Sequence, residues 1–254
     1  MTRPWGFGIS SALCWMLAAV SCAAPRAPAS RTPQPTAAAA PVSPASPPDL
    51  GYHMRASFWD TIEARDALIA GDLARAQRAA DRLAKTDYAA ALPRDWMHWT
   101  AQLQQRAGEL SLAPDLSSAA QALARIALVC GECHELHDAG PEHPRVPPLP
   151  WEDPPEAFDA RMQRHQLGMV QMWDGLVLPS EQAFRSGTVT ITRAPLRAPE
   201  QAATPIAESL KARVEEVRAL AKDARRATTY EERGRVYGEL IARCAQCHYY
   251  NRPE

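Results

Sequence analysis

The stretch DLSSAAQALARIALVCGECHELH, residues 115–137, decides the fold of this 254-residue chain. Its small and apolar side chains recur at spacings that alternate between four and three residues: Leu116, Ala120, Leu123, Ala127, Cys130 and His134. This spacing is typical of a helix that buries one face in a bundle. Asp115 follows Pro114 and occupies the position expected of an N-cap residue. We therefore predict a helix over residues 115–137.

The end of this stretch carries the motif C-x-x-C-H, as Cys130-Gly-Glu-Cys133-His134, and the motif recurs as Cys244-Ala-Gln-Cys247-His248. C-x-x-C-H is the attachment sequence for c-type haem. On a helix both cysteines and the histidine lie on one face. A zinc half-site or a redox dithiol is the alternative, but a zinc ribbon places its second Cys pair roughly 15–20 residues on. We predict two covalently bound haem c groups, with His134 and His248 as iron ligands.

The chain reads as an internal duplication. A Pro-rich connector at residues 138–155 separates residues 49–137 from residues 156–254, and each part holds one C-x-x-C-H run. The first predicted helices of the two parts align at an offset of 108 residues. This offset pairs Met54, Ile62, Asp66, Leu68 and Ile69 with Met162, Val170, Asp174, Leu176 and Val177. We predict two tandem haem domains, 49–137 and 156–254.

The predicted fold class is all-α, with each domain a four-helix bundle, because no run alternates convincingly as a strand. The predicted helices cover residues 50–70, 72–85, 94–108, 115–137, 156–177, 180–186, 205–226 and 230–249. Asp72 is expected to cap one of them, and Thr229 with Glu232 to form a capping box. The β-rich piece Thr188–Thr192 is short and alone, and residues 188–203 are expected to form a loop. The tryptophans, Trp59 and Trp173 among them, are expected to lie mostly in the core.

The N-terminus is predicted to be an export signal. Arg3 precedes an apolar run from Phe7 to Val20 that is too short to span a membrane. Ala19-Val20-Ser21-Cys22 resembles a bacterial lipobox, with ordinary signal-peptidase cleavage near Cys22 as the alternative. Cys22 is also the one cysteine left over from the signal and the haem motifs, and acylation explains it. We predict a lipoprotein signal peptide at 1–21, lipidation at Cys22 and a Pro/Ala-rich tether at 22–48, which gives an exported, periplasm-facing protein. Ala23 after the cysteine favours the outer membrane.

A four-helix unit with C-x-x-C-H at the end of its last helix, and a Met near the start of its first, resembles the class II cytochromes c, cytochrome c′ and cytochrome c-556. The resemblance covers residues 50–137 and 156–250. It implies a sixth iron ligand early on the first helix, where Met54 and Met162 stand. His165, three residues after Met162, is the alternative at the second haem, and core packing is the alternative role for both methionines.

These observations favour an electron carrier over an enzyme. The expected protein is a membrane-tethered di-haem cytochrome whose partners are periplasmic or membrane redox proteins. The alternative is a protein that binds NO or CO, or reduces peroxide, at a haem with an open distal side. The net charge of −1 gives no basic footprint for nucleic acid. The resemblance also implies that two chains can pair as a homodimer.

Overall fold

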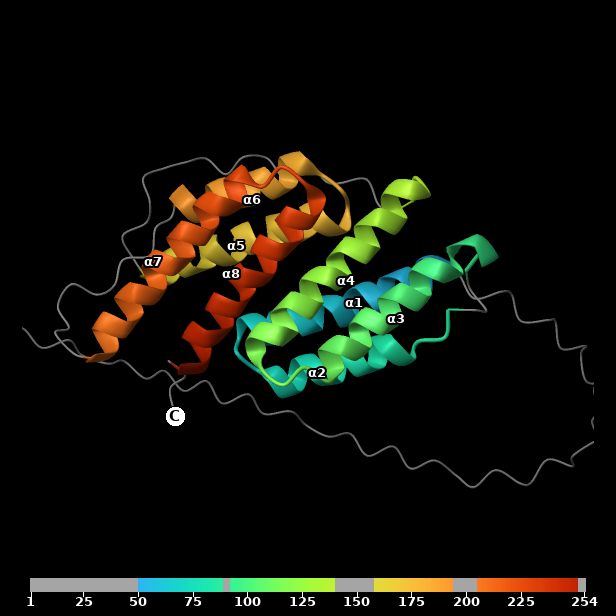
Figure 1. Ribbon diagram of the computed structural model, residues 1–254, viewed down its shortest axis with the longest axis horizontal. Coiled ribbons are helices and arrows are strands. Elements are labelled where there is room, and N and C mark those ends of the chain that lie inside the picture. The colour runs from blue at the N-terminus through green and yellow to red at the C-terminus, as the bar shows by residue number, and fades with distance from the viewer. Residues whose placement is uncertain (1–49, 89–91, 140–157, 194–204, 251–254) are drawn as a thin grey trace, which may run out of the picture. The chain divides into compact units, whose positions relative to one another are not determined.

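The structure is a computed structural model that describes residues 50–88, 92–139, 158–193 and 205–250 (Figure 1). Within these residues the protein is all-helical, and they contain no strand. Eight α-helices follow one another: α1 Leu50–Ile69, α2 Leu73–Lys85, α3 Met97–Ser111, α4 Leu116–Leu136, α5 Phe158–Val177, α6 Glu181–Arg193, α7 Pro205–Arg226 and α8 Tyr230–Tyr250. The prediction of an all-α fold is confirmed.

The helices form two groups with the same pattern of contacts. In the N-terminal group (α1–α4), each helix contacts the next along the chain and α4 contacts α1. In the C-terminal group (α5–α8), each helix likewise contacts the next and α8 contacts α5. Between the groups, α4 packs along α8, as Figure 1 shows at the centre of the molecule. In addition α1 contacts α8 and α5 contacts α4, so each group lays its first helix against the last helix of the other.

Local capping explains several helix starts. The Asp72 carboxylate accepts a hydrogen bond from the Arg75 backbone N–H at 3.0 Å, and the Asp115 carboxylate accepts one from Ser118 at 2.7 Å. The capping box is also present, because the Thr229 hydroxyl accepts from the Glu232 N–H and the Glu232 carboxylate accepts from the Thr229 N–H. The helix predicted over 94–108 instead opens with a 3₁₀ turn, Arg94–Trp96, and continues to Ser111.

The loop predicted from residue 188 is wrong over its first part, because α6 continues to Arg193. Three threonine hydroxyls return hydrogen bonds to carbonyls one turn earlier, as Thr188 does to Arg185 and Thr192 to Thr188. Thr190 bonds both the Ser186 carbonyl and the Gln171 side chain of α5. Tertiary burial against α5 therefore outweighs the β-propensity of this segment. Residues 194–203 of the predicted loop lie outside the described residues.

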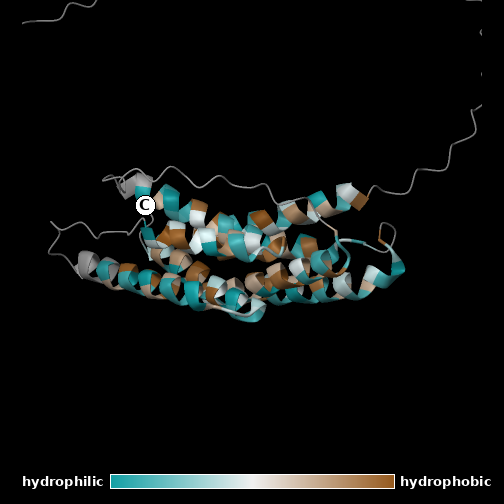
Figure 2. Cartoon of the chain, turned by 90° about the horizontal axis from the view of Figure 1, so that it is seen from above, coloured by the Kyte–Doolittle hydropathy of each residue, from teal (hydrophilic) through white to brown (hydrophobic). Residues whose placement is uncertain are grey.

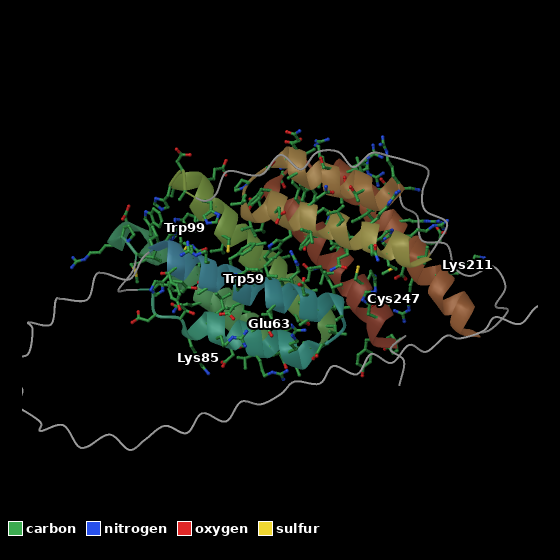
Figure 3. The ribbon with its side chains drawn as sticks, turned by 180° about the vertical axis from the view of Figure 1, so that it is seen from behind. Trp59, Glu63, Lys85, Trp99, Lys211 and Cys247 are labelled. Atoms are coloured by element: carbon green, nitrogen blue, oxygen red, sulfur yellow. The ribbon has the colours of Figure 1, made fainter. Side chains whose placement is uncertain are left out.

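Hydrophobic and hydrophilic residues alternate along the helices (Figure 2), and the apolar ones meet in one core that spans both groups. Its largest fully buried side chains include Trp173, Tyr88, Tyr237 and Phe184. The expectation for Trp173 is confirmed. The expectation for Trp59 is wrong, since this side chain is 66% exposed on α1 (Figure 3). Phe58, the residue before it on α1, is also exposed.

Several predictions fall on residues that the structure does not describe. The signal peptide, Cys22, the tether 22–48 and most of the connector 138–155 lie outside the described residues. Among the helices that are described, none is both long enough and apolar enough to cross a membrane.

Candidate functional site

Both C-x-x-C-H motifs lie in the last turns of long helices, the first on α4 and the second on α8. Figure 3 shows Cys247 on α8, the helix that packs against α1. All four cysteines are thiols at half-buried positions. Burial raises the pKa of Cys130 to about 12 and that of Cys244 to about 12. This shift is opposite to the lowered pKa on which a catalytic dithiol relies.

The two motif histidines make the same hydrogen bond. His134 Nδ1 lies 2.8 Å from the Val177 carbonyl oxygen, and His248 Nδ1 lies 2.5 Å from the Ile69 carbonyl oxygen. A carbonyl oxygen only accepts, so in each ring Nδ1 carries the proton and donates it. In a neutral imidazole the other nitrogen, Nε2, then holds a lone pair. Each ring is thus oriented and fixed in the tautomer that ligates a metal through Nε2.

The predicted repeat aligns the residues of these two carbonyls, and each carbonyl accepts from the histidine of the other group. Val177 ends α5 and receives the bond from His134 of the N-terminal group, while Ile69 ends α1 and receives the bond from His248 of the C-terminal group. The sequence alignment pairs Ile69 with Val177. Their role as hydrogen-bond acceptors could not be predicted, because every residue has a backbone carbonyl.

The residue after the first cysteine of each motif is small because the other group packs directly against it. A Cβ added to Gly131 would collide with the Leu176 carbonyl of α5 and the Tyr230 hydroxyl of α8. Ala245, the equivalent residue of the second motif, is fully buried, and its carbonyl oxygen lies 2.8 Å from where a Cβ on Gly71 would be. Gly71 follows α1 with a φ of +72°, a conformation that favours glycine.

Tyr230 lies beside the first motif, and a second buried tyrosine, Tyr88, pairs with Ser57 of α1. Tyr230 donates its hydroxyl hydrogen to the Leu176 carbonyl, and burial raises its pKa, with the nearby Cys130 thiol contributing. Tyr88 lies 2.8 Å from the Ser57 hydroxyl, oxygen to oxygen. Burial raises the pKa of Tyr88 to about 12, again with a contribution from Cys130. The Ser57–Tyr88 pair therefore joins α1 to the segment that follows α2.

The predicted sixth ligands lie on the first helix of each group. Met54 is half-buried one turn before Ser57 and packs against the core. Met162 is half-buried on α5, and His165, the counterpart of Ser57, is buried. Antiparallel neighbours α1 and α4 bring Met54 and the first motif to the same end of the N-terminal group. Ligation by Met54, Met162 or His165 stays a prediction.

A buried polar cluster between the groups was not predicted. Arg65 of α1 is only 5% exposed, and its guanidinium lies 5.8 Å from the ring centre of Trp173 on α5. The Trp173 ring lies 6.0 Å from that of Tyr237 on α8. In the described part of the molecule, Arg65 Nη1, Trp173 Nε1 and the Tyr237 hydroxyl have no hydrogen-bond partner. The predicted repeat pairs Arg65 with Trp173 at its offset of 108 residues, and this is the sequence signal that relates them.

Comparisons with known proteins give no relative: no family model matches the chain, and no curated protein or solved structure matches it. Within the described residues, no three His, Cys, Asp or Glu side chains lie close enough together to hold a metal ion by themselves. A haem iron takes only one or two protein ligands, so this second finding does not bear on haem.

Proposed function

We propose that this protein is an exported di-haem c-type cytochrome that transfers electrons between redox partners outside the cytoplasmic membrane. Each helix group is proposed to be a four-helix bundle that carries one haem at the end of its last helix. The observation that carries the proposal is the matched pair of histidines, each of which donates from Nδ1 to a backbone carbonyl and keeps Nε2 for a metal. This arrangement occurs twice, at the two C-x-x-C-H motifs.

The residues present fit a covalently bound haem. Cys130 with Cys133, and Cys244 with Cys247, would hold one group each as thioethers. Attachment would add each thiol S–H across a vinyl C=C of the haem, with a C–S bond formed and the hydrogen on the other vinyl carbon, so no external oxidant would be needed. His134 and His248 would ligate the iron through Nε2. A haem held in this way supplies a one-electron iron couple.

Met54 and Met162 are the proposed sixth ligands, with His165 as the substitute at the second site. A thioether on the sixth position raises the reduction potential relative to an imidazole. Met54 supports this role by its half-buried place near the start of α1, a helix that contacts α4. A methionine that ligated the iron would exclude small gases from it and so favour electron transfer.

The proposed protein is also exported and anchored to a membrane. Cys22 would carry lipid, and residues 22–48 would tether the helices to a membrane, with the outer membrane favoured. The partners would be periplasmic or membrane redox proteins. This part of the proposal is supported by the sequence alone.

The proposal is tested by reduced pyridine spectra of protein that has been extracted with acid acetone. We expect the colour to stay with the protein, with the absorption of haem c. Cys130→Ala with Cys133→Ala, and separately Cys244→Ala with Cys247→Ala, should each halve the haem content. Colour that is extracted into the solvent would overturn the proposal.

Gas binding is the second candidate, and one observation favours it at the first site. Ser57 lies one turn after Met54, the proposed sixth ligand, and its buried hydroxyl pairs with that of Tyr88, so this pair could donate a hydrogen bond to a ligand bound there. Rapid CO binding by the reduced wild-type protein would support this function over electron transfer. Resistance to CO would support the electron carrier.

A further inference from the structure

Each C-x-x-C-H histidine is held by the helix group that does not contain it. We propose that the two haem sites are built reciprocally: the end of α1 orients the axial histidine of the second haem, and the end of α5 orients that of the first. Ile69 and Val177 are thus positioning residues through their carbonyls. The inference rests on the proposed function.

The ends of α1 and α5 each offer a backbone acceptor to a histidine of the other group. Ile69 and Val177 are the last residues of α1 and α5, where helix carbonyls have no partner within the helix. His248 Nδ1 reaches the Ile69 oxygen at 2.5 Å and His134 Nδ1 reaches the Val177 oxygen at 2.8 Å. The negative end of each helix dipole lies beside the same histidine. Each helix end therefore presents an acceptor with extra negative potential to an imidazole N–H of the other group.

Close packing against the other group fixes the helix ends that carry these carbonyls. Gly71, just after α1, lies so close to α8 that an added Cβ would be 2.8 Å from the Ala245 oxygen and 2.9 Å from the Tyr249 nitrogen. These two residues bracket His248 in the chain. On the other side, Gly131 of α4 meets the Leu176 carbonyl, one residue before Val177. The end of each group's first helix is therefore packed against the backbone beside the other group's histidine.

The chemical consequence is crossed control of the two potentials. A hydrogen bond from Nδ1 makes the imidazole more basic and favours the ferric iron, which lowers the reduction potential. Anything that separates the end of α1 from α8 should therefore raise the potential of the second haem and leave the first unchanged. If each histidine were held by its own group, a displaced end of α1 would instead change the potential of the first haem and leave that of the second unchanged.

The test is a redox titration of the intact di-haem protein in which NMR resolves the two haems. Gly71→Ala places a methyl group against the α8 backbone and should raise the potential of the haem at His248 only. Gly108→Ala on α3 is the matched control, because a Cβ there meets nothing within 4 Å, and it should move neither potential. A Gly71→Ala protein in which only the haem at His134 responds, or in which neither haem responds, would overturn the inference.

A second measurement needs no stable Gly71→Ala variant. In the reduced wild-type protein, the Nδ1 proton of His248 should show nuclear Overhauser contacts to Ile69 and Ala70, and that of His134 to Val177 and Leu178. Contacts from His248 to Val177 and from His134 to Ile69, or no such contacts from either histidine, would contradict reciprocal construction. A protein without covalent haem would instead fail the proposed function, so the two failures are distinguishable.

Discussion

At the scale of single residues, His134 and His248 each donate a hydrogen bond to the last carbonyl of a helix in the other group. The C-x-x-C-H motifs predict Cys130, Cys133 and His134 as haem-attachment residues from their type and spacing, and this stays a prediction. The carbonyls of Ile69 and Val177 could not be predicted, since every residue has one. Arg65 could not be predicted either, because it comes from α1 and meets Trp173 only after both groups have packed together.

Met54→Ala tests the proposed sixth ligand at the first haem. Loss of the thioether should leave that iron open, so the reduced variant should bind CO at one haem while the wild type resists it. The absorption spectrum in the Soret region measures this binding, and Met162→Ala is the matched variant for the second haem. Unchanged CO resistance in both variants would assign the methionines to core packing alone.

Tyr230 and Tyr237 form a matched pair for the free energy of unfolding. Tyr230→Phe should cost about 1–2 kcal/mol, because the Leu176 carbonyl loses its donor. Tyr237→Phe should be close to neutral, because its buried hydroxyl has no partner among the described residues. Urea denaturation of both variants measures the difference. Equal losses would mean that the Tyr237 hydroxyl has a partner that the protein side chains do not supply.

At the scale of elements, local signals predicted helix starts well and one helix extent poorly. Asp72, Asp115 and the Thr229–Glu232 box cap the helices that the sequence assigned to them. The start of α6 also follows a local signal, since the Ser180 hydroxyl accepts from the Ala183 N–H. Its length does not, because threonines that favour strands in isolation are here buried against α5. Tertiary packing decided that segment.

Asp115 should stabilise α4 in a pH-dependent way. Hydrogen bonds from Ser118 lower the pKa of its carboxyl, so the stabilisation is fully present above the ordinary pKa of an unfolded Asp and is lost as pH falls through the lowered value. Asp115→Ala should cost about 1 kcal/mol at neutral pH. Thermal unfolding at neutral pH and below about pH 3 measures the change, and Asp115→Asn is the control that keeps the cap. A loss that does not shrink in acid would contradict the capping role.

At the scale of the whole molecule, the predicted duplication assigns the helices to two parts but does not say how these parts meet. Sequence alignment pairs α1 with α5 and says nothing of which partner each helix end will contact. In the structure α1 lies against α8 and α5 against α4, so the first helix of each group contacts the last helix of the other. This crossing follows from packing small residues, Gly131 and Ala245, against the opposite helix ends.

Anchoring is also a property of the whole chain. Cys22→Ala should release the protein from the membrane fraction, because the proposed lipid is then absent, while the haem content stays the same. Membrane fractionation followed by haem staining measures both. A wild-type protein that is already found in the soluble fraction would contradict the lipoprotein proposal.

The most direct test of the central claim is the intact mass of the purified, denatured wild-type chain. Covalent haem survives denaturation, so the account predicts the mass of the mature polypeptide with two haem additions, and with one addition when Cys244 and Cys247 are both replaced by Ala. A wild-type mass with no haem addition, or with only one, would contradict a protein built from two reciprocal haem sites.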